Sequence, residues 1–161
     1  RMEYFGLSLE EEKSRLIEFG RYAKARCQKL GKKPETFTFL GFTHYCSQSR
    51  NGRFRVKRKT SKKKFAKKCR EINLLLARMR THSLKEIITK LNQILTGYYH
   101  YYGITDNSKS ITAFRYNIMR SLFYYLNRRS QKKSYNWISF LNMTNNSYPL
   151  VRPRIYVSVY E

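Results

Sequence analysis

The residues of this chain best suited to chemistry are lysines and arginines, and that chemistry is the binding of phosphate. Twelve of them lie between Arg50 and Arg70, a stretch without any acidic residue. Because so many like charges repel one another in water, a folded protein that keeps them is expected to have a polyanionic partner. The alternative is a solvated, highly charged face. The binding residues predicted in this run are Arg53, Arg55, Lys57, Arg58, Lys59, Lys62, Lys63, Lys64, Lys67 and Lys68.

A second basic cluster follows the third predicted helix and contains Arg128, Arg129, Lys132 and Lys133. Cations at the end of a helix also complement the helix dipole, which is the structural alternative. Since the cluster adds to an already large excess of positive charge, we interpret it as a further set of phosphate-binding residues.

Tyrosines form the third group of interest, with four of them in the five residues 98–102. On a helix they cover more than one face, so some belong to the core and others are exposed. Tyr98 and Tyr102 are interpreted as core residues with hydrogen-bonded hydroxyl groups, and the exposed members as candidates for base or sugar contact. Gly97, just before them, is expected to let another backbone approach closely.

Residues for catalysis or metal binding are not grouped in this sequence. His44 and Cys46 have no carboxylate beside them, and Asp106 is the only aspartate. Two-metal phosphoryl transfer requires clustered carboxylates, which are lacking here. The three cysteines contain no CxxC pair, so neither a disulfide framework nor a zinc site is indicated. We therefore predict no catalytic residue, no metal site and no cofactor for this chain.

The elements that position the N-terminal half of the chain are indicated by alternating and turn-forming residues. Residues 15–19 alternate as in a strand, residues 20–33 are typical of a polar connection, and residues 37–45 are predicted to form one strand. Asn51-Gly52 is a strong hairpin signal, and it predicts that this strand pairs with residues 54–59.

Helical periodicity begins at Thr60, where apolar residues recur at three- and four-residue spacing. Ser83 to Glu86 predicts a capping box that starts a second helix, and Gly103 is expected to end it. Asn107 or Ser108 is expected to cap a third helix. A short helix around 135–142 and an extended tail complete the chain. The predicted fold class is α+β, with a short β-hairpin followed by an α-helical bundle.

Composition separates the chain into two parts. Its 161 residues are 41% hydrophobic, which is enough for a core, and carry a net charge of +24. Residues 1–35 have a net charge of +3 and residues 36–161 one of +21, by count of their side chains. No signal peptide or membrane-length apolar run is found, so we expect no membrane partner. The start at Arg1-Met2 suggests a fragment of a larger protein.

Several ordered blocks of the sequence resemble group II intron reverse transcriptases, which also act as maturases. Residues 12–21 resemble the block that follows their catalytic motif, and Phe-Thr-Phe-Leu-Gly-Phe at 37–42 resembles the last palm block. Residues 57–64 resemble the beginning of their thumb, or maturase X, domain. The remaining matches to the thumb and its trailing segment are Leu91-Asn92-Gln93, Gly97-Tyr98-Tyr99, Tyr102-Gly103, residues 126–133, Trp137 and residues 153–155.

The resemblance implies binding of intron RNA and stabilisation of its splicing-active fold. It also implies contact with an RNA template–DNA primer duplex, with Leu40 and Gly41 as candidates for positioning the primer. The polymerase activity of the family depends on a Tyr-x-Asp-Asp motif that this sequence does not contain. The fingers, the earlier palm blocks and the zinc-containing endonuclease are also missing. We therefore expect no polymerisation by this chain alone, and Mg²⁺ only with the missing palm.

Three domains follow from the resemblance. Residues 1–59 are predicted to be the end of the palm with its hairpin, residues 60–133 the helical thumb or maturase domain, and residues 134–161 a trailing segment that leads toward a DNA-binding region. The expected partners are group II intron RNA, the template–primer duplex and the remaining palm and fingers. The expected compartment is the bacterial cytoplasm or an organelle.

We interpret the chain as the RNA-binding maturase fragment of a group II intron-encoded protein, which assists splicing and serves as the thumb of a reverse transcriptase. One alternative is a part of an intact RNA-directed DNA polymerase whose palm lies upstream or in a partner chain. The other is a decayed fragment with generic nucleic-acid binding.

Overall fold

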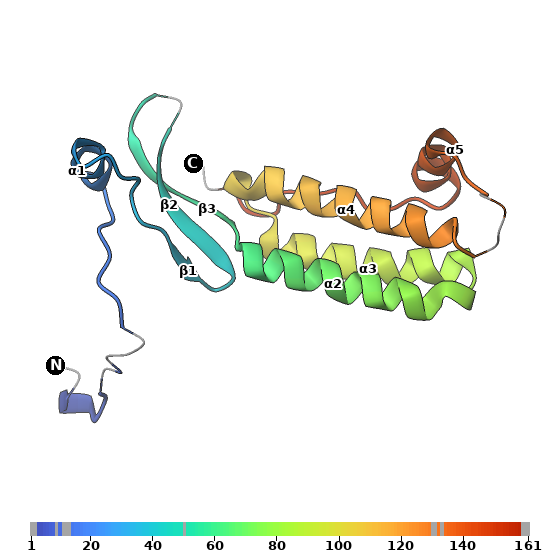
Figure 1. Cartoon of the computed structure of the whole chain (residues 1–161), viewed down its shortest axis with the longest axis horizontal. Coiled ribbons are helices and arrows are strands. Elements are labelled where there is room, and N and C mark those ends of the chain that lie inside the picture. Colours follow the sequence, from blue (N-terminus) through green and yellow to red (C-terminus); the bar gives the residue numbers. More distant parts are fainter. Residues whose placement is uncertain are drawn as a thin grey trace. The chain divides into compact units, whose positions relative to one another are not determined.

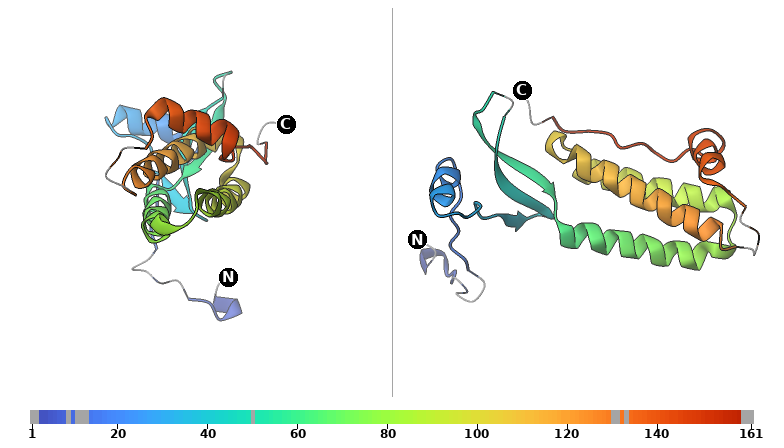
Figure 2. Two further views of the ribbon diagram at one scale, coloured as in Figure 1. Left: turned by 90° about the vertical axis from the view of Figure 1, so that its right-hand side faces the viewer. Right: turned by 45° about the horizontal axis from the view of Figure 1, so that its top comes forward.

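The computed structural model describes residues 3–8, 10, 14–49, 51–129, 132 and 134–158 (Figures 1 and 2). Contacts between residues divide the chain into two compact units. The first contains residues 1–39 and 43–57, and the second contains residues 40–42 and 58–161. The predicted domain boundaries after residues 59 and 133 stay predictions. The predicted α+β class, with strands followed by a helical bundle, is confirmed.

An antiparallel three-stranded sheet is formed by β1 (Phe37–Phe39), β2 (Phe42–Gln48) and β3 (Phe54–Thr60), in the order β1-β2-β3. The predicted hairpin between β2 and β3 is confirmed. The Ser49 amide donates to the Arg53 carbonyl at 2.8 Å, and Gly52 has a φ of 72°. Glycine adopts this left-handed conformation without the steric penalty of a Cβ atom.

The prediction of one continuous strand over 37–45 is wrong, because the chain reverses at Leu40 and Gly41. Their φ angles are 46° and 77°, and positive φ at both central residues is what a two-residue type I′ hairpin turn requires. Leucine rarely adopts positive φ. The aromatic and β-branched residues on both sides therefore gave a continuous strand pattern that concealed the turn.

The N-terminal part of the first unit also differs from prediction. Residues 15–19 form no strand, and the predicted polar connection contains a helix, α1 (Ala23–Lys29). Only Ala23 and Cys27 of this helix are buried, so its apolar periodicity is too short to detect. Upstream of it, Glu3–Phe5 form a 3₁₀ turn, η1.

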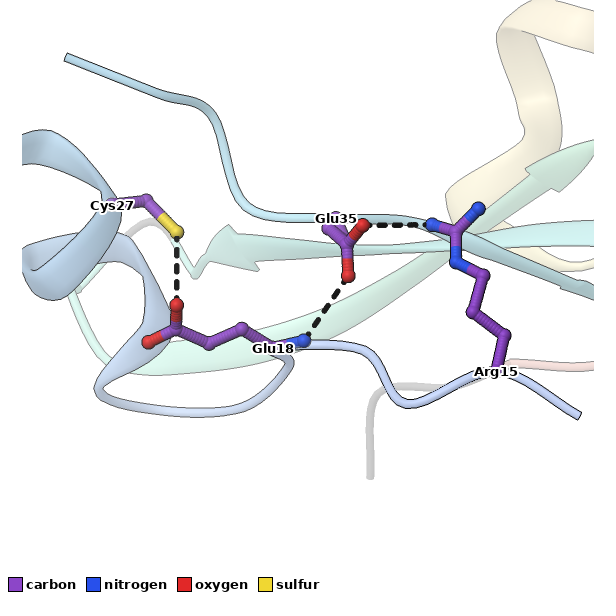
Figure 3. Close-up of polar contacts among 4 residues, drawn as sticks. All are labelled: Arg15, Glu18, Cys27 and Glu35. Atoms are coloured by element: carbon purple, nitrogen blue, oxygen red, sulfur yellow. Dashed lines mark hydrogen bonds and ion pairs between the residues drawn. The ribbon is translucent and has the colours of Figure 1, made fainter. Parts of the chain in front are cut away.

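Side chains hold the segment before α1 in place of a strand ladder (Figure 3). Arg15 Nη2 lies 2.8 Å from Glu35 Oε1, and Glu35 Oε2 accepts from the Glu18 amide at 3.2 Å. The Cys27 thiol donates to Glu18 Oε2 at 3.7 Å. Burial and the nearby Glu18 carboxylate raise the pKa of this thiol, which is therefore protonated and packs as a small apolar group.

The second unit is built on three helices that lie side by side and run in alternating directions (Figures 1 and 2). They are α2 (Lys62–Arg78), α3 (Leu84–Tyr102) and α4 (Ser108–Leu126). The 3₁₀ turns η3 (Met79–Thr81) and η4 (Thr105–Asn107) occupy the two short connections. Such short connections place consecutive helices antiparallel to one another, as predicted for a bundle.

The core of the bundle contains the predicted apolar stripes. Those that are buried include Ile72 and Leu76 on α2, Ile87, Ile88, Leu91 and Leu95 on α3, and Ile111, Phe114, Ile118, Leu122 and Leu126 on α4. Phe65, Cys69 and Met79 pack against them with partial burial. Side chains of this kind contribute about 1.5–3 kcal/mol each when fully buried.

The ends of α3 are set by two different physical effects. The predicted capping box is present, since Ser83 Oγ accepts from the Glu86 amide and the Glu86 carboxylate accepts from the Ser83 amide at 2.9 Å. The Ser83 hydroxyl also donates to the Glu86 carboxylate at 2.8 Å, and the hydrogen bonds from this hydroxyl and from the Ser83 amide lower the pKa of Glu86. Gly103 ends the helix as predicted, but with a negative φ of −78°. Glycine is needed there because a Cβ atom would lie 2.2 Å from the carbonyl oxygen of Tyr99.

The C-terminal part of the chain returns along the bundle after a short helix (Figure 1). The predicted fourth helix is α5 (Trp137–Asn142), and it continues into a π-helical turn, η5 (Met143–Ser147). The tail is extended as predicted. Asn92 of α3 holds it by donating to the Pro149 carbonyl and accepting from the Val151 amide, both at 2.9 Å. Within the described part of the chain, no helix is long and apolar enough to cross a membrane.

Candidate nucleic-acid interface

The start of α2 is fixed by a buried polar group. Ser61 caps the helix, with its Oγ accepting from the Lys64 amide at 3.3 Å. Just before it, the Thr60 amide donates to Asn107 Oδ1, and Asn107 Nδ2 donates to Thr60 Oγ1, both at 2.8 Å. The same Nδ2 group also donates to the Tyr102 carbonyl at 2.9 Å. Asn107 therefore links the end of β3, the end of α3 and the start of α4, and it orients the first turns of α2.

A groove of about 480 Å³ lies between α2 and α3. Its α2 wall carries Lys64, Lys67 and Lys68, which are three and four positions apart on one helical face. Its α3 side includes Gln93, Ile94, Gly97, Tyr98, Tyr101 and Tyr102. Phe65, Cys69 and Ile72 pack into the core from the other side of α2. We call this feature the lysine groove.

Gly97 keeps the lysine groove open. The prediction that it admits a second backbone is wrong, because a Cβ atom at this position would have nothing within 4 Å. The residue is exposed in the middle of α3. Glycine costs about 1 kcal/mol relative to alanine in a helix, so the groove gains depth at this position at the expense of stability.

The electrostatics of the lysine groove favour a polyanion. Its lining contains three lysines and a single acid, Glu71, among the described residues. The Lys68 ammonium lies 3.1 Å from the Glu71 carboxylate in a partly exposed pair. Such pairs contribute about 0–1 kcal/mol, so phosphate can compete for this lysine. The described contacts include no ion pair for Lys64 or Lys67, both of which are exposed.

The tyrosines of α3 divide between the core and the groove. Tyr98 and Tyr99 are buried, whereas Tyr101 is 54% exposed and Tyr102 is half-buried. The predicted hydrogen bond of the Tyr98 hydroxyl is not formed, because this oxygen is buried without a partner among the described residues. The Tyr98 ring stacks on Phe114 with centroids 3.7 Å apart. Burial raises the pKa of Tyr98 and Tyr102, so both phenols are neutral at physiological pH. Tyr101 is thus the ring of this group that a nucleotide can reach most easily.

The two predicted primer-positioning residues lie beside this end of α3. The Tyr101 hydroxyl donates to the Leu40 carbonyl at 2.8 Å, and a Cβ atom on Gly41 would lie 2.7 Å from the Tyr102 hydroxyl oxygen. The Phe42 ring stacks on Tyr101 with centroids 5.9 Å apart. The Leu40–Gly41 turn is therefore held against the aromatic end of the lysine groove, with the Leu40 side chain 66% exposed.

The other predicted binding residues of the basic run are distributed over several surfaces. Arg55, Lys57, Arg58 and Lys59 belong to β3, and Lys62 and Lys63 are exposed on the first turn of α2. Arg53 lines a separate hollow of the first unit, together with Arg21 and Lys24. Sequence reasoning missed these last two residues. Arg21 precedes α1 and Lys24 belongs to it, and the signal for this helix in the sequence is the i, i+4 spacing of Ala23 and Cys27.

The second basic cluster is not part of the lysine groove. The lysine groove lies along the first half of α2, whereas Arg128 and Arg129 follow the last turn of α4, at the opposite end of the bundle (Figure 1). A helix of the 17 residues of α2 is about 25 Å long. Arg129 and Lys132 are exposed, and Lys133 lies outside the described residues. The Arg128 guanidinium lies 4.4 Å from the centroid of the Tyr124 ring.

The described residues include no group of three or more His, Cys, Asp or Glu side chains that fits a metal ion. All three cysteines are free thiols, and burial raises the pKa of Cys69. The side chains that line the lysine groove can form ion pairs with phosphates and can place an aromatic ring against a sugar or base.

Part of the chain matches a known protein family. Residues 62–139 match the family described as "Group II intron, maturase-specific domain". The matched segment begins at the first residue of α2 and ends within α5, so it contains the lysine groove and the surface around Arg128. No curated protein and no solved structure is significantly similar to the chain.

Proposed function

We propose that the chain binds folded group II intron RNA and stabilises its splicing-active shape. The proposal starts from the match of residues 62–139 to the group II intron maturase-specific domain. The recognition of the family from sequence is confirmed by this match. The maturase-specific domain is non-catalytic. Binding and ordering of RNA are therefore the activities assigned to the described residues.

The observation that supports the proposal best is the lysine groove. It places three lysines on one wall and the exposed Tyr101 ring on the other, within a single compact unit. Lysines contact the backbone of RNA without reading its sequence, and double-stranded RNA is recognised mostly by shape and by its phosphates and 2′-hydroxyls. Binding through this groove would therefore select folded RNA, which is what an intron presents.

A second role, contact with an RNA template–DNA primer duplex, is supported by the Leu40–Gly41 turn. The hydrogen bond from Tyr101 to the Leu40 carbonyl connects this turn to the end of the lysine groove. A duplex bound by the lysines would then extend toward this turn, at which the Leu40 side chain is exposed. Polymerisation itself, with Mg²⁺, would require a palm and fingers outside this sequence.

Competition binding tests the proposal. The chain is titrated with a group II intron RNA and with a scrambled RNA of equal length, both at physiological salt. A clear preference for the intron RNA is expected, because its fold presents an ordered phosphate surface. Equal affinity for the two RNAs would contradict the proposed maturase function and would support generic nucleic-acid binding instead.

Primer extension with the chain alone separates the polymerase alternative. We expect no product above background, since the catalytic motif of the parent family is absent from the sequence. Extension by the chain alone would overturn the assignment of a purely binding role. Extension only after a separate palm chain is added would support the alternative of a split polymerase.

A further inference from the structure

A second groove, of about 970 Å³, lies between α4 and α5 at the other end of the bundle from the lysine groove. One helical face of α4 and its C-terminal extension supplies Tyr116, Arg120, Tyr124 and Arg128, each four positions after the one before. Residues at this spacing lie above one another on a helix, about 6 Å apart along its axis. We call this alternation of ring and cation the tyrosine–arginine ladder.

The rings of the ladder are accessible. Tyr116 is 53% exposed and Tyr124 is 47% exposed, although both line the groove. The Arg128 guanidinium lies over the Tyr124 ring at 4.4 Å, which presents a flat, cationic surface to the groove. Nucleobases stack on both aromatic rings and guanidinium planes. An apolar ligand alone would not explain why each ring alternates with a cation.

Trp137 of α5 provides the opposite wall and packs in an aromatic cluster. Its ring lies edge-on to Phe123 at 5.2 Å and stacks on the fully buried Phe140 at 5.4 Å. The segment before it is anchored because Asn127 donates to the Tyr135 carbonyl and accepts from the Tyr135 amide, both at 2.9 Å. The groove is therefore pre-organised, which lowers the entropy cost of binding.

The charge of this groove is positive. Its lining contains Arg120 and Arg128 and no acidic side chain among the described residues. Two cations alternating with two rings match the repeating chemistry of a nucleic-acid single strand, in which each phosphate alternates with a base. A duplex would hide its bases from the rings, and an aromatic peptide would leave the two arginines without partners.

We propose that the tyrosine–arginine ladder binds an unpaired segment of RNA, with bases stacking on Tyr124 and against Trp137 and phosphates pairing with Arg120 and Arg128. The inference rests on the proposed function, because it names the unpaired part of the RNA that the maturase-specific domain contacts. It adds a site for single-stranded RNA that is distinct from the lysine groove and at the opposite end of the bundle.

Trp137 reports on this site directly, since it is the only tryptophan of the chain. The full chain is titrated with an octamer of uridylate and with an abasic octamer that has the same phosphates. Quenching of the Trp137 emission is expected with the first RNA and not with the second. Replacement of Tyr124 by Leu is expected to weaken octamer binding about 5- to 140-fold, the range that corresponds to the loss of one stacked base.

Two further variants separate stacking from damage to the fold. Tyr124→Phe keeps the ring and is expected to bind as the unchanged chain does. Tyr148→Leu removes an exposed tyrosine that lies outside both grooves and is expected to have no effect on binding or quenching. Loss of binding in the Phe variant would overturn the proposal, as would equal loss in the Tyr148 variant.

The failure of this inference differs from the failure of the proposed function. If intron RNA binds preferentially but uridylate leaves the Trp137 emission unchanged, only the ladder site is overturned. If uridylate quenches but intron RNA has no advantage over the scrambled RNA, the ladder site stands and the maturase function is overturned. Equal quenching by the abasic octamer, or by an acidic peptide, would show that no base is read and would overturn the ladder site.

Discussion

The lysine groove makes a quantitative prediction about salt. We consider a triple variant in which Lys64, Lys67 and Lys68 are each replaced by Gln. Each phosphate neutralised on duplex nucleic acid contributes about −0.9 to the slope of log K against log salt concentration. Three contacts therefore contribute about −2.7, and two contribute about −1.8 if Glu71 retains Lys68.

These slopes convert into affinity. The counterion term vanishes at about 1 M salt, so the variant and the unchanged chain are expected to bind equally there. At about 0.15 M salt, a slope that is smaller by 1.8–2.7 lowers the association constant of the variant by roughly 30- to 170-fold. The triple variant is accordingly expected to bind folded RNA about two orders of magnitude more weakly at physiological salt. Its affinity should approach that of the unchanged chain as salt rises, because the lost term is electrostatic.

Fluorescence anisotropy with a labelled intron RNA, at salt concentrations from about 50 to 200 mM, measures both quantities. The matched control replaces three lysines that are exposed elsewhere on the bundle, Lys85, Lys90 and Lys109, by Gln. It changes the net charge by the same amount, from +24 to +21 after subtraction of three charges. A small loss of affinity is expected for the control. If both triple variants lose affinity and slope equally, the charge acts as a diffuse field and the lysine groove is not the binding site.

Three predictions concern stability, each measured by denaturant unfolding. Asn107→Leu is expected to destabilise the chain by about 3–5 kcal/mol, because it removes two buried hydrogen bonds and one partly buried one and leaves their partners unsatisfied; the exposed Asn117, replaced in the same way, should change stability by less than about 1 kcal/mol. Gly41→Ala and Gly52→Ala both place a Cβ atom at positive φ, at a cost of about 1–2 kcal/mol each. A larger loss is expected at Gly41, where the new atom also meets a hydroxyl oxygen at 2.7 Å, whereas equal losses would show that this contact relaxes freely. The pKa of Glu86 is lowered by its capping hydrogen bonds, so its contribution is present above about pH 4.5 and is lost as pH falls through the lower folded-state pKa. Glu86→Gln should therefore show a flatter dependence of stability on pH below 4.5, and an unchanged dependence would exclude the capping carboxylate as its source.

Much of the bundle was accessible from sequence because its signals are local. The three long helices follow from apolar spacing, and the capping box of α3 and the Asn51-Gly52 hairpin lie where their residues predict. A capping box or a hairpin turn involves residues only a few positions apart. The interactions that stabilise such a feature therefore come from residues that are close together in the sequence.

The failures have a common physical origin. Residues 15–19 alternate like a strand but have no ladder partner, and side chains such as Glu35 hold them instead. The turn at Leu40 is hidden because leucine is rarely found at positive φ. Its hydrogen bond with Tyr101, which lies 61 positions away, helps to stabilise it. In each case the stabilising partner is remote in sequence.

The amino-acid sequence by itself predicted a polyanionic partner and a helical bundle, and it carried the resemblance to maturases that the match at residues 62–139 supports, because net charge, periodicity and ordered motifs do not depend on how helices meet. Tertiary packing determined which of the basic residues lie together. It joined three lysines of α2 to the tyrosines of α3, and it left the Arg128 cluster at the other end of the bundle. The tyrosine–arginine ladder is present in the sequence, but it becomes a groove only because α5 brings Trp137 opposite to it. Which helical faces meet depends on the burial of the whole core, and no short stretch of residues contains that information.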